Sequence, residues 1–197
     1  ELYVNSRILD TLDIWDMQLC SYGKKIIHIR KQFMEELNLI IHQIHGRLTG
    51  DKEDICLEYE PDVNEDEFET RLALARDKDL KMKVSSTGPH RDDFCVRVNG
   101  IDIRKFGSQG QQRTAALSLK MAELRLVKNR IHDDPVLLLD DVLSELDSGR
   151  QNYLLKSIND IQTMITCTGL DEFIQNQFSI NKVFRVTDGK VSIIEED

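Results

Sequence analysis

The chain has 197 residues, of which 40% are hydrophobic and 31% are charged, and its formal net charge is −9. This length allows one substantial core, or one compact lobe with an elongated appendage. No apolar run approaches the length needed to span a bilayer, and the first residues lack the layout of a secretory signal. The net acidity argues against a general polyanion-binding surface, although it leaves room for one local basic patch.

The cysteines, at positions 20, 56, 95 and 167, form no C-x-x-C pair. This spacing argues against a zinc site and against a disulfide framework. Reduced thiols in a cytoplasmic protein are the simplest interpretation. Because the chain begins without Met, we expect it to be part of a longer protein.

The first fifty residues form the most periodic segment. A helix over 6–48 would be roughly 60 Å long, which is too long for a compact lobe to bury. We therefore expect one arm of a helical hairpin, whose partner lies largely upstream of residue 1. Gly23 is a weak point at which this rod could break into two helices. The apolar residues recur in steps of four and three, as in a coiled-coil seam: Ile8, Leu12, Trp15, Leu19, Tyr22, Ile26, Ile29 and Phe33.

The rest of the chain alternates short strands with helices. Its apolar run at 136–139 is typical of a strand that is buried on both faces of a parallel sheet, within a βαβ-like unit. The expected elements, in chain order, are a strand at 55–59, a helix over about 65–83, a β-hairpin over 93–103 that turns at Asn99-Gly100, a helix over about 111–131, the strand at 136–139, a helix near 149–158, a strand near 162–167 and a hairpin that turns at Asp188-Gly189 before an acidic tail.

Two acidic residues, Asp140 and Asp141, follow the apolar run directly. In open α/β sheets ligands bind at the carboxyl ends of the strands, and an Asp there can hold Mg²⁺ against nucleotide phosphates. Buried strands that end in acidic residues are also common in proteins without such a site. The pattern alone leaves both interpretations open.

A second group of residues lies in the loop before the helix at 111–131. Ser108, Gly110 and Gln111 stand where a helix N-terminus presents unpaired N–H groups and the positive end of its dipole, and both suit a phosphate. A plain N-cap role for Ser108 explains the same residue type. The segment Ser-Glu-Leu-Asp at 144–147 follows the two carboxylates and completes the constellation.

The order and spacing of these pieces resemble the RecF family of ABC-type, SMC-like ATPases. The resemblance rests on GPHRDD at 88–93, FGSQGQQRT at 106–114 and LLLDDVLSELDSGRQNYL at 137–154, and LDIWD at 12–16 resembles the family's helical arm. It implies an α/β fold in two parts. We expect residues 1–85 to form a helical arm subdomain that contains one short strand. Residues 86–197 would be the C-terminal lobe of a P-loop ATPase head, with a mainly parallel sheet and flanking helices.

In this family two protomers enclose ATP between them, so that the signature loop of one protomer contacts the nucleotide held by the other. The resemblance implies a role for each matching residue: signature contacts in trans for Ser108, Gly110 and Gln111, the Walker B Mg²⁺ ligand for Asp140, orientation or activation of water for Asp141, the D-loop acid for Asp147 and the switch position for Thr168.

One motif of these ATPases is missing from the sequence. None of the glycines belongs to a G-x-x-x-x-G-K-[ST] pattern, so the Lys and Ser/Thr that hold the phosphates are absent. Because phosphoryl transfer needs all these groups in position, we expect negligible ATP hydrolysis by this chain alone and no tight binding of ATP or Mg²⁺. Asp141 stands where many ABC enzymes have Glu, which fits a slow, switch-like ATPase in the full-length protein.

The resemblance implies an ATP-dependent DNA-binding protein of recombinational gap repair and replication restart. ATP would close a homodimer on duplex DNA or on a duplex–single-strand junction, with a RecR-type recombination mediator as partner. The alternative is the head of a structural ATPase of the SMC or cohesin type, although the arm is short for a tether. A defence-system ATPase of related fold is a third possibility, and no nuclease centre supports it.

Four further residues have no assigned role. His90 and Arg91 in GPHRDD form either a contact to DNA or a partner, or part of an internal salt-bridged turn, and the sequence leaves both open. His42 and His45 lie three residues apart on the long helix, and we interpret them as solvated histidines rather than metal ligands.

Overall fold

The computed structural model describes residues 6–168 and 182–194, and the acidic tail predicted at the end lies outside them. The chain divides into two compact units, Glu1–Leu126 and Val127–Asp197, which are described separately below. The α/β class is confirmed. Among the described helices, none is both long and apolar enough to cross a membrane.

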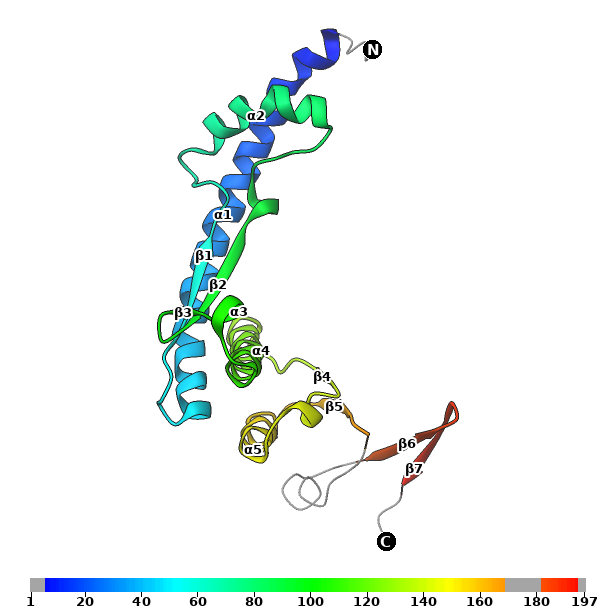
Figure 1. Ribbon diagram of the computed structural model, residues 1–197. Coiled ribbons are helices and arrows are strands. Elements are labelled where there is room, and N and C mark those ends of the chain that lie inside the picture. Colours follow the sequence, from blue (N-terminus) through cyan, green and yellow to red (C-terminus); the bar gives the residue numbers. More distant parts are fainter. Residues whose placement is uncertain (1–5, 169–181, 195–197) are drawn as a thin grey trace. The chain divides into compact units, whose positions relative to one another are not determined.

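The first unit holds a long helix, a small sheet and the start of the helix that leads out of it (Figure 1). Its elements are α1 (Ser6–Thr49), β1 (Ile55–Glu60), α2 (Phe68–Met82), the 3₁₀ turn η1 (Pro89–Arg91), β2 (Asp93–Val98), β3 (Ile101–Asp102), α3 (Ile103–Phe106) and the first part of α4 (Gln109–Ile131).

The long helix α1 is unbroken, as the periodicity predicts. Strands β1 and β2 run alongside its middle (Figure 1). The Asn38 side chain fixes this contact, because its amide donates to the Leu57 carbonyl (2.6 Å) and its oxygen accepts from the Leu57 N–H (2.7 Å). Asn38 thus satisfies the backbone N–H and C=O of Leu57, as a neighbouring strand would.

Gly23 does not break α1, and it has a packing role instead. A Cβ at this position would lie 2.1 Å from Cε1 of Phe68, so the phenyl ring needs the space that a glycine leaves. The other side of the ring lies against Gly88, whose Cβ would be 3.2 Å from Cζ. The ring therefore sits between two glycines. It belongs to a buried cluster formed by Cys20, Ile27, Val63, Phe68 and Leu72.

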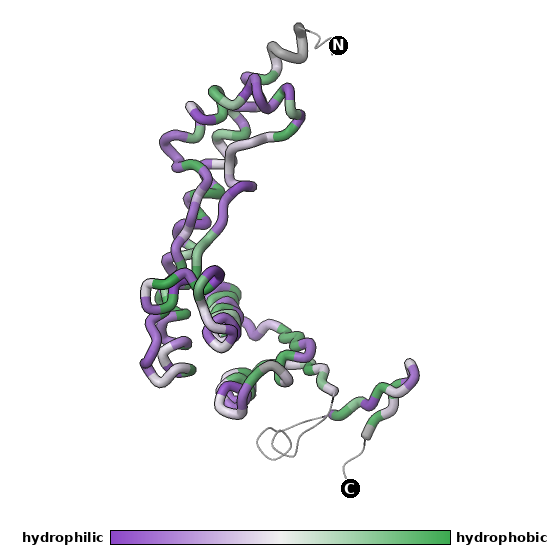
Figure 2. The backbone as a smooth tube through the Cα atoms, viewed as in Figure 1, coloured by the Kyte–Doolittle hydropathy of each residue, from purple (hydrophilic) through white to green (hydrophobic). Residues whose placement is uncertain are grey.

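The predicted seam of α1 is largely exposed in the described residues. The side chains of Trp15, Tyr22 and Ile29 are 59%, 63% and 59% exposed, whereas Cys20 and Ile27 on the adjacent stripe are buried. Apolar residues therefore occur on two stripes of the helix, and Figure 2 shows them scattered along its length. A partner for the exposed stripe remains a prediction, and Ile8 lies outside the residues whose side chains are described.

The sheet of the first unit is antiparallel, in the order β1-β2-β3. Its β2–β3 hairpin turns at Asn99 and Gly100, whose φ angles of 51° and 79° are those of the predicted tight turn. The expected hairpin is therefore confirmed, except that Ile103 begins α3 instead of extending the strand.

The second unit contains a parallel pair and a hairpin. Its elements are the C-terminal end of α4, β4 (Leu137–Asp140), the 3₁₀ turn η2 (Leu143–Glu145), α5 (Ser148–Ser157), β5 (Thr163–Thr166), β6 (Val183–Thr187) and β7 (Lys190–Ile194). Strands β4 and β5 pair in parallel, and α5 lies between them in the sequence, which confirms the βαβ-like unit. Strands β6 and β7 are antiparallel and turn at Asp188-Gly189, as predicted.

The expectation of a strand buried on both faces is wrong for β4 in the described residues. Leu138 is 70% exposed and Met164 on β5 is 65% exposed, so one face of the pair is open to solvent. The predicted mainly parallel sheet is also wrong for the part of the chain that the structure describes, where β4 and β5 pair in parallel and the other strand pairs are antiparallel. Two strands cannot bury each other's side chains without layers of structure on both faces.

Candidate functional site

The loop before α4 folds as a capping box. The Ser108 hydroxyl accepts from the Gln111 N–H (3.2 Å), and the Gln111 side-chain oxygen accepts from the Ser108 N–H (3.1 Å). Ser108 is therefore the N-cap of α4, which is the plain capping role that its residue type predicts. Ser108 and Gly110 are exposed at the positive end of the helix dipole, so this geometry also keeps them accessible to an anion.

The capping box is anchored to α3 through the Ile103 carbonyl. That oxygen accepts from the Gly107 N–H (3.1 Å) and from the Gln112 side-chain amide (2.8 Å). A Cβ on Gly107 would lie 2.6 Å from the same oxygen, so only glycine allows this close approach.

The two predicted aspartates lie at the end of the parallel pair, where Thr166 contacts the side chain of Asp140 and the backbone of Asp141. The Thr166 hydroxyl donates to Asp140 Oδ1 and accepts from the Asp141 N–H (3.1 Å). Asp141 has a φ of 51°, a conformation that non-glycine residues rarely adopt and that is enriched at functional sites.

Thr166 was missed by the sequence reasoning, which selected Thr168 instead. Thr166 is the register partner of Asp140 across β4 and β5, so correct alignment of the two strands would have revealed it. Thr168 is exposed and lies just beyond the end of β5.

Asp147 is the N-cap of α5. Its carboxylate accepts from the Arg150 N–H (3.0 Å) and forms an ion pair with the Arg150 guanidinium. The backbone hydrogen bond from Arg150 holds the pKa of Asp147 below its usual range. The carboxylate is therefore charged at neutral pH, and its side chain remains 56% exposed.

The predicted site residues fall in both units. Ser108, Gly110 and Gln111 belong to the first unit, whereas Asp140, Asp141, Asp147 and Thr168 belong to the second. Hydrogen bonds join Ser108 to Gln111, the two aspartates at 140 and 141 to Thr166, and Asp147 to Arg150. The chain thus carries two separate sets of polar groups suited to phosphate or metal chemistry.

Comparisons with known proteins identify the family. No protein-family model matches the chain. A DNA replication and repair protein RecF of Agathobacter rectalis is 56% identical over 189 residues, which cover 96% of this chain and 52% of the relative. A RecF of Lachnospira eligens is 59% identical over 187 residues, covering 95% and 52%. This chain belongs to the RecF family. It spans about half the length of the curated relatives it matches.

Solved structures agree with the RecF assignment. The recombination mediator protein RecF with ATP, from the RecFOR pathway, matches with a TM-score of 0.80 and 34% identity, over 94% of this chain and 51% of that one. An SMC ATPase matches with a TM-score of 0.50 and 15% identity, over 86% and 89%. The second likeness shows a shared fold alone.

The GPHRDD segment of this RecF-family chain forms an internally bonded turn. Asp92, whose side chain is 3% exposed, accepts from Arg30 (2.8 Å) and from the Tyr59 hydroxyl. His90 and Arg91 both contact the Ser85 carbonyl, at 2.9 Å and 3.3 Å. Of the two interpretations left open, these contacts favour the internal turn over a contact to DNA.

Contacts at the start of the same turn make the free energy of unfolding depend on pH. Asp62 accepts from the Thr87 hydroxyl (2.7 Å) and the Gly88 N–H (3.0 Å). The Thr87 hydrogen bond is the main reason that the pKa of Asp62 lies below its ordinary value of 3.8. A lowered folded-state pKa contributes stability above the ordinary value, and this contribution is lost as the pH falls through the folded value.

We therefore expect Thr87→Val to lower the free energy of unfolding by about 1–2 kcal/mol near neutral pH. The difference from the original chain should shrink below about pH 4, because protonated Asp62 gains less from the hydroxyl. Urea unfolding at pH 7 and pH 3 measures this, with exposed Thr70→Val as the control. A difference that stays constant with pH would contradict the assignment.

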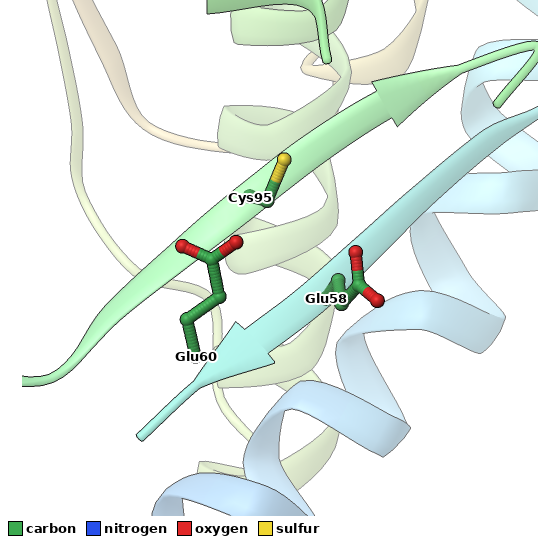
Figure 3. A group of neighbouring side chains, drawn as sticks. All are labelled: Glu58, Glu60 and Cys95. Carbon is green, nitrogen blue, oxygen red and sulfur yellow. The ribbon is translucent and has the colours of Figure 1, made fainter. Parts of the chain in front are cut away.

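A group of possible metal ligands lies on the sheet of the first unit (Figure 3). Ligand atoms of Glu58, Glu60 and Cys95 lie within 4.8 Å of one another. Arg97 binds Glu58 (2.6 Å) and Arg104 pairs with Glu60 (3.6 Å), and burial raises the pKa of the Cys95 thiol. The carboxylates are thus already neutralised by arginines, and the thiol resists the deprotonation that metal binding needs. We assign this group a structural role.

Proposed function

We propose that this chain is the C-terminal half of an ATP-dependent DNA-binding protein that acts in the cytoplasm in recombinational gap repair and replication restart. It would supply the signature motif and the Walker B carboxylates to an ATP-dependent homodimer. The observation that carries this proposal is the network of Asp140, Thr166 and Asp141 at the carboxyl end of a parallel strand pair. Ligands of open α/β sheets bind at that edge.

The donor set suits Mg²⁺ and ATP only in part. Asp140 would hold Mg²⁺, and carboxylate oxygens are its preferred protein ligands. When bound, the ion neutralises charge on the β- and γ-phosphates. Asp141 would orient or activate the attacking water. The Lys of a phosphate loop is absent from this sequence, so these residues form half of a nucleotide site.

Residues of both units would complete the partner's site. Ser108, Gly110 and Gln111 would contact the nucleotide of the second protomer, and their place at a helix N-terminus supports this role. Asp147 would act as the D-loop acid toward the partner, and its exposed carboxylate supports that assignment. Thr168 would hold the switch position. We keep an arm subdomain at 1–85 and a head lobe at 86–197 as the proposed domains.

The proposed partners are DNA, as a duplex or a duplex–single-strand junction, and a RecR-type recombination mediator. The relatives' description as DNA replication and repair proteins supports DNA as the ligand. A structural ATPase of the SMC type is the alternative. The same description of the relatives favours the repair protein.

A chimera tests this proposal. This chain would replace the matching half of the Agathobacter rectalis relative, and analytical ultracentrifugation would measure its mass with and without ATP and DNA. We expect a monomer without nucleotide and a dimer with ATP, and tighter binding to duplex DNA with ATP. Ser108→Arg should prevent the dimer, because a bulky cation would occupy the signature loop. A chimera that stays monomeric with ATP, or a Ser108→Arg variant that still dimerises, would contradict the proposal.

A further inference from the structure

A chain of hydrogen bonds, buried at His45 and partly buried at Glu53, connects the end of α1 to the capping box of α4. His45 is fully buried, and its Nδ1 lies 2.9 Å from the Ser118 hydroxyl. Its Nε2 lies 3.2 Å from Glu53 Oε2, and Glu53 Oε1 accepts from the Gln111 side-chain amide (3.1 Å). The interpretation of His45 as a solvated histidine is therefore wrong, whereas His42 is 64% exposed.

The direction of these hydrogen bonds follows from the proton on Ser118. That hydroxyl donates to the Thr114 carbonyl (2.8 Å), and it has only one proton to give. Its oxygen must therefore accept from His45, so Nδ1 carries a hydrogen. One further proton lies between Nε2 and Glu53, on either atom. Every polar atom of the buried imidazole then has a partner, as burial requires.

The chain ends on the residue that closes the capping box. The Gln111 amide uses its oxygen for the Ser108 N–H and its nitrogen for Glu53. Both ends of one planar group are thereby fixed. Without Glu53 the amide can rotate away, and the Ser108 N–H then loses its acceptor.

We propose that His45 and Glu53 are positioning residues that hold Gln111 and thereby fix the signature loop to the end of the arm helix α1. A displacement at the end of α1 would then change the loop directly. The importance of this coupling for ATP rests on the proposed function. The coupling itself involves only residues of this chain, so it can be measured without nucleotide or a second protomer.

Exchange of the Ser108 amide proton, measured by NMR on the 197-residue chain, reports the coupling. We expect Glu53→Leu to accelerate this exchange about tenfold, because the Gln111 side chain is released. Glu53→Gln should stay within about twofold, because its oxygen can accept from Gln111 while its amide donates to Nε2 of a neutral His45. The conservative variant therefore separates hydrogen bonding from mere packing.

The adjacent exposed pair provides matched controls. His42 and Asp54 lie 3.0 Å apart and are 64% and 72% exposed. His42→Ala and Asp54→Ala should leave Ser108 exchange within about twofold. Unchanged exchange in Glu53→Leu would overturn the proposal, as would equal acceleration in Glu53→Gln and Glu53→Leu. The imidazole ¹⁵N shifts supply a second test that needs no variant, since a bare Nδ1 would contradict the deduced direction.

The chimera distinguishes this inference from the proposed function. If the coupling and the proposed function are both correct, Glu53→Leu raises the KM of the chimera for ATP, while Glu53→Gln leaves it near the original value. Accelerated Ser108 exchange in a chimera that shows no response to ATP would support the coupling and contradict the proposed function. If Glu53→Leu leaves Ser108 exchange unchanged in a chimera that dimerises with ATP, the result would support the proposed function and contradict the coupling.

Discussion

Asp140→Asn in the chimera is expected to lower ATP hydrolysis by about 10²–10³-fold, the scale on which one preorganised electrostatic contact acts. The variant removes the charge that would hold Mg²⁺. It keeps a side-chain oxygen that can accept from the Thr166 hydroxyl, so the network at the end of the strands should survive. Steady-state phosphate release measures the effect, and thermal unfolding should show little change.

A control for this variant exists in the same unit. Asp134 is an exposed acid that pairs with Lys128 (2.5 Å), outside the proposed site. Asp134→Asn should therefore leave hydrolysis near the original rate. An Asp140→Asn chimera that retains more than half of the original rate would remove Asp140 from the role of metal ligand.

The second large effect concerns stability, and its sign is diagnostic. Replacing a glycine with alanine inside a helix ordinarily stabilises a protein by about 1 kcal/mol. For Gly23→Ala we expect the opposite, a loss of about 1–3 kcal/mol from overpacking. The added Cβ would lie 2.1 Å from Cε1 of Phe68, and the ring cannot shift freely because Gly88 adjoins its other side.

Urea unfolding followed by circular dichroism measures this loss. Ser21→Ala, on the exposed face of the same helix, should be neutral or stabilising. In a Phe68→Leu background, which has space for a Cβ, the cost of Gly23→Ala should largely disappear. If Gly23→Ala stabilises the original chain, Gly23 has no packing role.

Local chemistry made much of the fold predictable. The recurrence of apolar residues in α1 and the Asn-Gly and Asp-Gly turns depend on neighbours in sequence, and the structure has them where they were expected. Ser108 is similar, because a capping box needs only a Gln three residues later.

The unpredicted features depend on contacts between distant residues. Gly23 reads as a helix breaker until Phe68, 45 positions later, is placed against it. His45 reads as exposed until Ser118 and Glu53 surround it. Thr166 gains significance only when β4 and β5 are aligned. No periodicity or spacing within a window of sequence contains this information.

The exposed apolar surfaces of the two units have a shared interpretation. Trp15 and Tyr22 on α1 and Leu138 on β4 are each more than half exposed. A stand-alone protein rarely leaves so much apolar surface uncovered on its regular elements. The match to only half the length of the relatives agrees with these surfaces being covered in a longer protein.

We propose that this chain carries half of a nucleotide site. The most direct test is ATP turnover by the purified 197-residue chain at micromolar concentration, measured beside the chimera that supplies a phosphate loop. We predict no turnover above buffer for the chain and slow, Asp140-dependent turnover for the chimera. Turnover by the chain alone at the rate of the chimera would contradict the account, because the groups that hold the phosphates would then lie within these residues.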